Sequence, residues 1–210
     1  MNISQMQEDA LTEFANIGAA RAAKHLSVLL HDKIKMTVPC LMYGAPGNLP
    51  QMLKASSQEV MVGVQQQLEG FFSAKITFLF CANDSAALAQ ELIGQNRLEE
   101  DTSVGMRALQ YDAITEIGNI VMTAFINALI DSLDETLRLS LPNYVEGTFT
   151  DLLAASSSKN NKGDSSILLL KTNLEAERRN VLGALVLIIS DADLEHLMHK
   201  IDLWLKKLGA

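Results

Sequence analysis

Apolar residues recur every three to four positions in two long stretches of the chain, residues 4–31 and 103–131, and this spacing predicts two long amphipathic helices. The sides expected to be buried carry Leu11, Phe14, Gly18, Ala22, His25 and Leu29 in the first helix, and Ile114, Ile117, Val121, Phe125 and Ala128 in the second. The opposite sides carry Asp9, Glu13, Asn16, Ala20 and Ser27, and Asp112, Glu116, Asn119 and Thr123. Because an amphipathic helix buries its apolar side, we expect both acid-and-amide stripes to face solvent.

Shorter apolar runs predict strands over residues 33–44, 59–70, 72–80, 136–147, 166–176 and 180–190. Glu69 and Gly70 are expected to join two of these strands in a hairpin, and the last two form a second hairpin. Pro39 lies inside the first strand, which is expected at a sheet edge or a bulge because proline cannot donate a ladder hydrogen bond. Residues 84–94, with Asp84 as N-cap, and 191–208 predict helices. Residues 44–50, 95–101 and 156–166 have the composition of turns and loops.

The two stripes belong to a duplicated motif. Residues 9–17 read DALTEFANI and residues 112–120 read DAITEIGNI, with six of nine positions identical. Pro39 follows Asn16 by 23 positions, and Pro142 follows Asn119 by the same 23. Chance would give about one identity in nine at ordinary residue frequencies. The chain is therefore predicted to be a single domain of two structural repeats, about residues 1–102 and 103–210, related by a pseudo-twofold axis.

Charge and composition argue against several classes of function. With a net charge of −8, the chain lacks the clusters of Lys and Arg that nucleic acids and anionic membrane surfaces require. The N-terminus has no secretory signal pattern, and the longest apolar run, VLGALVLII, is too short to span a bilayer. Cys40 and Cys81 lie in predicted strands, where reduced thiols are expected. We therefore expect a cytoplasmic protein that binds neither nucleic acid nor membrane.

The stripes also carry candidate chemistry. In a helix, Asp9, Glu13 and Asn16 fall within about 60° of one another. Such a stripe is most often simply the solvated face of a helix. The Asp could also cap the helix, and the Glu could pair with a lysine. The prolines are most simply explained as residues that shape the strands. Asn16 and Asn119 fit no such role well, because Asn is a mediocre helix former that is normally selected for caps and turns.

An exposed amide beside a carboxylate suits one kind of reaction. The amide can donate to a phosphoryl oxygen and accept from a water, while the carboxylate can hold a cationic partner. These groups fit water positioning in phosphoryl transfer, where catalysis is mostly placement and charge stabilisation. A covalent mechanism is not indicated, because no activated Ser, Cys or His accompanies them. Metal binding is not indicated either, since His196 and His199 lack a third ligand in their helix.

The pattern Asp-x3-Glu-x2-Asn-x22-Pro, present twice, resembles the CheC/CheX/FliY phosphatases of bacterial and archaeal chemotaxis, and looks most like CheC. CheX-like members carry one motif in a shorter chain, and FliY-like members add a C-terminal flagellar switch domain, for which this chain ends too soon. The resemblance covers essentially the whole chain. It implies an α+β fold in which two long motif-bearing helices pack together on an antiparallel β-sheet.

The same resemblance implies dephosphorylation of the phospho-aspartate of the chemotaxis response regulator CheY. By matching positions, Glu13 and Glu116 would contact a lysine of the regulator, and Asn16 and Asn119 would align the attacking water. The residues that would support the motif, in structure or in docking, are Asp9, Pro39, Asp112 and Pro142. Mg²⁺ and the phosphorylated Asp belong to the regulator, so no cofactor of the chain's own is expected.

Two questions stay open at this level. The first motif has Phe14-Ala15 where the second has Ile117-Gly118, so the two sites need not be equally active. The competing interpretation is a non-catalytic adaptor that binds a response regulator, a flagellar switch component or the receptor deamidase CheD, which some relatives bind.

Overall fold

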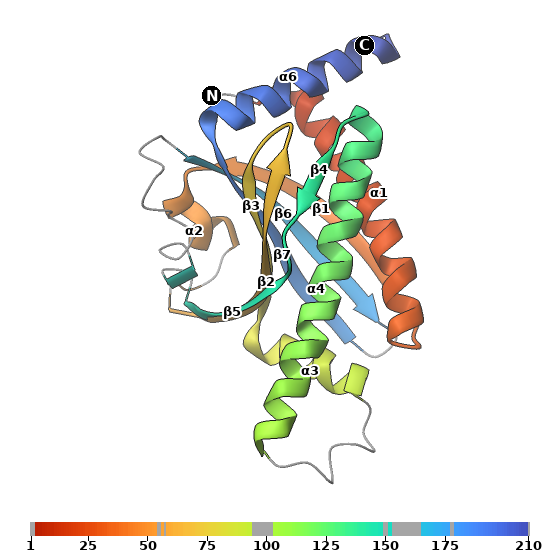
Figure 1. The fold of residues 1–210 in the computed structure, drawn as a ribbon, viewed down its shortest axis with the longest axis vertical. Helices are drawn as coiled ribbons and strands as arrows, with labels where there is room; N and C mark the ends of the chain where they lie inside the picture. The colour runs from red at the N-terminus through yellow and green to blue at the C-terminus, as the bar shows by residue number, and fades with distance from the viewer. Residues whose placement is uncertain are drawn as a thin grey trace.

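The computed structural model describes residues 3–53, 56, 58–93, 103–148, 151–152, 165–176 and 179–209. In chain order its elements are α1 (Gln5–Leu29), β1 (Lys35–Gly44), η1 (Pro46–Asn48), α2 (Leu49–Leu53), β2 (Val60–Gly70), β3 (Ala74–Cys81), α3 (Ala82–Ile93), α4 (Ser103–Leu133), β4 (Leu137–Leu139), β5 (Asn143–Thr148), β6 (Ser165–Ala176), β7 (Arg179–Ser190) and α6 (Asp191–Leu208) (Figure 1). The two long helices, both hairpins and the terminal helix are confirmed. The predicted connector 95–101 and residues 156–164 of the predicted loop lie outside the described residues.

The strands form one antiparallel sheet in the order β1-β6-β7-β3-β2-β4, with β5 also paired to β2. Helices α1 and α4 lie side by side over one face of this sheet (Figure 1), so the α+β fold class is confirmed. Strand β1 pairs with β6 of the second half of the chain, while β4 and β5 pair with β2 of the first half. If the halves are related by a twofold axis, pairing of β1 with the second half must be matched by equivalent pairing of β4 and β5 with the first half. The division into two repeats stays a prediction, which this pairing supports.

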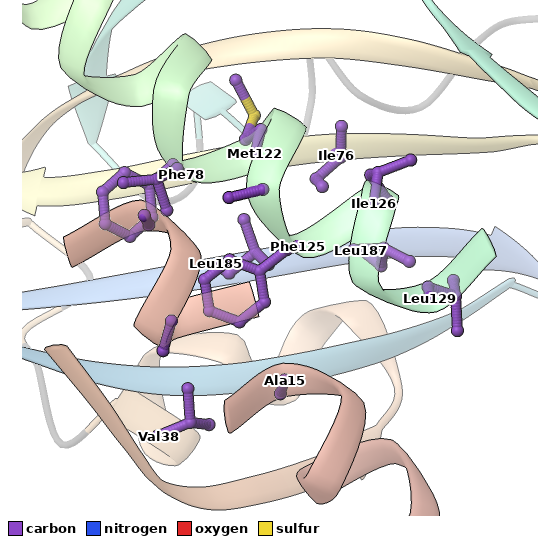
Figure 2. Close-up of a cluster of buried hydrophobic side chains, with 14 of the residues drawn as sticks. Ala15, Val38, Ile76, Phe78, Met122, Phe125, Ile126, Leu129, Leu185 and Leu187 are labelled. Atoms are coloured by element: carbon purple, nitrogen blue, oxygen red, sulfur yellow. The ribbon is translucent and has the colours of Figure 1, made fainter. Parts of the chain in front are cut away.

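The main core fills the space between the helices and the sheet. Figure 2 shows part of it, with Met122 and Phe125 of α4 beside Ile76 and Phe78 of β3 and Leu185 and Leu187 of β7. The two long helices approach closely at Gly18, where an added Cβ would lie 2.7 Å from the Cα of Phe125. A smaller cluster, which includes Leu49, Met61 and Leu169, covers the other face of the sheet.

Three local predictions are wrong. Residues 46–50 of the predicted turn 44–50 are helical, because Pro46 starts η1 at a position that suits its fixed φ and missing N–H. Helix α3 begins at Ala82, so Asp84 lies in its first turn and is not the N-cap. His25 is exposed, because the covered side of α1 drifts around the helix and is occupied near its end by Ala23 and Leu26.

The two prolines have different outcomes. Strand β1 is an edge strand, and its register with β6 shifts between Thr37 and Cys40, so both expectations for Pro39 are confirmed. The second predicted strand, 136–147, is instead split into β4 and β5 by residues 140–142. The backbone N of Ser140 still donates to the carbonyl oxygen of Gln67 at 2.9 Å, but Gln67 N donates to Ser140 Oγ at 2.9 Å and not to a carbonyl oxygen. Pro142 has no N–H to donate, so the ladder is interrupted at this segment.

One described helix, Arg107–Leu133 within α4, is long and apolar enough to cross a bilayer. In this protein 61% of its most apolar window is buried, as in a helix that forms the core of a soluble domain, and one such helix is weak evidence for a membrane span.

Candidate functional site

The first motif lies on the outer side of α1. Asp9, Glu13 and Asn16 are all exposed there, as the helical spacing predicts. The Oδ1 atom of Asn16 accepts a hydrogen bond from the backbone N of Val38, 3.4 Å away in β1 and next to Pro39. The long separation between Asn16 and Pro39 in the sequence is therefore closed by the packing of α1 on β1. The amide is tied to the strand through its oxygen.

The second motif lies on the outer side of α4. Asp112 and Glu116 are exposed, and Asn119 is partly exposed. The Oδ1 atom of Asn119 faces the Nε2 of Gln66 in β2 at 3.5 Å, and the same Nε2 donates to the carbonyl oxygen of Ser140 at 2.7 Å. A side chain of the sheet thus joins Asn119 to the segment that contains Pro142.

The two sites are separate. Asn16 is linked to β1 and Asn119 to β2, and these strands are four positions apart in the sheet order. At the usual spacing of neighbouring strands this corresponds to about 19 Å. Each motif is therefore presented on its own helix, and the structure does not bring the two motifs together.

The structural interpretations of the two acids in the first motif lose support. Ser4 caps α1 in a capping box with Gln7, so Asp9 is not the cap. Asp9 instead accepts a hydrogen bond from Gln5 Nε2 at 2.9 Å on the helix surface. Within the described residues, the ion pairs are Arg21–Asp131, Lys35–Glu175 and Lys200–Glu135, and none uses a motif carboxylate. The motif acids are therefore available to a cationic partner.

The arrangement leaves each amide ready to bind something outside the protein. With the oxygen of each Asn facing a donor of the sheet, no described residue accepts from its Nδ2. Both N–H groups can then donate to an oxyanion, and the oxygen keeps a second lone pair for a water proton. Across the described residues, no group of three His, Cys, Asp or Glu side chains could hold a metal ion.

Sequence reasoning missed Gln66 and Val38 as neighbours of the motif amides. Val38 acts through its backbone N–H, for which the sequence carries no signal. Gln66 could have been noticed, because it interrupts the alternating series Val62, Val64 and Leu68 of a predicted strand with a polar residue.

Comparison with known proteins agrees with the motif. Residues 6–43, which span the first motif from its helix to Pro39, match the CheC-like family. The chain is 27% identical to the CheY-P phosphatase CheC of Bacillus subtilis (strain 168) over 140 residues, which are 67% of this chain and 66% of that relative's length. The predicted resemblance to CheC-like proteins is thereby confirmed.

Solved structures share the fold. FliY of Thermotoga maritima has a TM-score of 0.74 at 18% identity, and the match covers 97% of this chain and 100% of that one. A FliG-FliM complex from H. pylori gives a TM-score of 0.63 at 11% identity, with 94% and 100% covered. At these identities the likeness concerns the fold alone.

Proposed function

Because the chain resembles CheC-like proteins, we propose that it is a phosphatase that removes the phosphoryl group from the phospho-aspartate of a CheY-type response regulator in the cytoplasm. The observation that carries the proposal is the repeated placement of an Asn amide on the outer side of a long helix, with a Glu one turn earlier. In both copies the amide oxygen is approached from the sheet and the NH₂ group has no partner among the described residues.

In the proposed reaction, the Asn positions a water in line with the phosphorus atom. The water oxygen forms a bond to phosphorus, the bond between phosphorus and the aspartyl oxygen breaks, and the products are the Asp carboxylate and inorganic phosphate. Glu13 and Glu116 bind a lysine of the regulator. Mg²⁺ is held by the regulator, so this chain contributes placement and hydrogen bonds. Asp9, Asp112, Pro39 and Pro142 support the two helices and strands that present these groups.

The test is the decay of a phosphorylated CheY-type regulator from the same organism. Wild type should accelerate the decay, Asn16→Ala and Asn119→Ala should each retain part of the activity, and the double variant should lose it. Asn127→Ala is the matched control, because Asn127 is an exposed Asn further along α4 that lies outside the motif. No acceleration by wild type with any regulator of the organism would refute the phosphatase assignment.

The two Glu residues should have a different kinetic signature. Glu13→Ala and Glu116→Ala should mainly raise KM, because the carboxylates are proposed to bind the partner before and during reaction alike. Glu195→Ala, at an exposed position of α6, is the control. A fall in kcat at unchanged KM would contradict the docking role.

The second candidate is a non-catalytic adaptor for a response regulator, CheD or a flagellar switch component. The observation in its favour is that the same fold occurs in the FliM middle domain from H. pylori and in a FliG-FliM complex from the same organism. A stoichiometric complex with unphosphorylated regulator, together with unchanged phosphate release, would support the adaptor over the phosphatase.

A further inference from the structure

Gln66 occupies a core position that the strand pattern reserves for an apolar residue. Strand β2 turns Val62, Val64, Gln66 and Leu68 towards the helices, and all four are buried, Gln66 with 3% exposure. A buried amide needs hydrogen-bond partners that a leucine or methionine would not. A conflict of this kind between strand pattern and residue type is expected mainly at functional sites.

The amide of Gln66 is used only at its nitrogen. Nε2 donates to the Ser140 carbonyl oxygen at 2.7 Å and faces Asn119 Oδ1 at 3.5 Å. The Oε1 atom is buried and has no partner among the described residues. Burial of this side chain with an unpartnered oxygen costs free energy. Its short hydrogen bond and its longer contact are both made to the second site, at Ser140 and at Asn119.

Close packing of α4 on β2 makes this contact possible. Gly118 precedes Asn119, and an added Cβ there would lie 2.5 Å from Val64 Cγ2. The helix backbone therefore approaches the strand more closely than any larger residue would allow. The first motif has Ala15 at the matching position. Its Asn16 accepts a hydrogen bond from a backbone N–H of β1 and has no side-chain partner like Gln66 among the described residues.

From these contacts we infer that Gln66 is a positioning residue of the second site, where it holds the amide of Asn119 in register with the Ser140–Pro142 segment. The inference rests on the proposed phosphatase function and makes the two sites unequal: the second depends on a side chain that can be removed, and the first on a backbone group that cannot. Gln66 does not touch the substrate, and it acts through Asn119.

The variant that tests this is Gln66→Met. Methionine shares the unbranched shape of glutamine, is only slightly larger, and removes both the donor and the unpartnered oxygen, so the fold should melt at or above the wild-type temperature. In an Asn16→Ala background, where only the second site remains, Gln66→Met should lower kcat by about tenfold and leave KM within about twofold. In an Asn119→Ala background it should change neither. Gln67→Met is the control, because Gln67 is the next residue of β2 and its side chain is exposed on the opposite face of the sheet.

A readout without turnover separates this inference from the proposed function. In the amide spectrum of the protein, Gln66→Met should shift the side-chain NH₂ resonances of Asn119 and leave those of Asn16 in place. If wild type hydrolyses no regulator, the phosphatase proposal fails, and the Asn119 shift alone decides whether Gln66 positions that amide. Equal loss of rate in both backgrounds, unchanged rate in both, or an unmoved Asn119 resonance would overturn the inference.

Discussion

Gly118 lies at the contact between α4 and β2, and the substitution Gly118→Ala tests whether this contact is as close as the structure has it. The new Cβ would lie 2.5 Å from Val64 Cγ2 and 2.6 Å from Val64 Cβ. Carbon atoms pack at about 3.5–4.0 Å, so helix and strand would have to separate by about 1 Å. Val64 is fully buried, and its own Cβ cannot rotate away from the intruding methyl group.

The expected loss of stability follows from two opposing terms. Overpacking a well-packed interior costs about 1–3 kcal/mol, and two contacts well below 3.0 Å place Gly118 in the upper half of that range, at about 2–3 kcal/mol. Replacing a mid-helix Gly by Ala stabilises the helix by about 1 kcal/mol, because Ala has the higher helix propensity. We therefore expect Gly118→Ala to lower the free energy of unfolding by about 1–2 kcal/mol. For a domain of this size the midpoint of thermal unfolding should fall by about 3–6 °C.

Thermal and urea unfolding, followed by circular dichroism, measure the effect. The matched control is Gly47→Ala in η1, where an added Cβ would meet nothing within 4 Å, so its stability should stay within about 0.5 kcal/mol of wild type. If Gly118→Ala unfolds at or above the wild-type temperature, helix propensity outweighs the contact and the argument from close packing is wrong. The separation of α4 from β2 should also lower hydrolysis at the second site more than at the first.

Two further predictions concern ionisable groups. Burial raises the pKa of Cys81 to about 11, assisted by the thiol's hydrogen bond to Glu59 and by the charge of that carboxylate. In a Cys40→Ser variant, alkylation of Cys81 should be slow near about pH 8 and should accelerate as the pH approaches the raised pKa. Adding Glu59→Gln should speed alkylation at about pH 8. Fast alkylation at this pH in Cys40→Ser alone would contradict the raised pKa of Cys81. Hydrogen bonds from the hydroxyl and the N–H of Thr148 hold the pKa of Asp151 below its usual 3.8. The Asp151 carboxylate therefore stabilises the folded state above that usual value and loses the effect as pH falls through the lowered pKa. An NMR titration of Thr148→Val should show the Asp151 pKa returning towards 3.8.

Much of the helical part of the fold could be predicted from the sequence because helix formation is local. The 3.6-residue period located α1, α4 and α6, and the same period put Glu13, Asn16 and Glu116 on outer faces. The face assignment failed at His25, where the covered side of α1 depends on how the helix crosses its neighbours. The family resemblance was also accessible, since the motif is a matter of spacing along one chain.

The strand pairing and the neighbours of the motif amides were decided only by the tertiary structure. Pro39 and Pro142 stand at the same distance from their Asn residues, yet one lies in a bulged edge strand and the other in a break between two strands. The difference arises because β-sheet hydrogen bonds join segments far apart in sequence, such as Ser140 and Gln67. In the same way, the sequence determined that two amides would be presented on two helices. Asn16 is held by the Val38 N–H and Asn119 by the Gln66 side chain. This difference depends on how closely each helix packs on its strand, a distance that cannot be inferred from spacing along the chain.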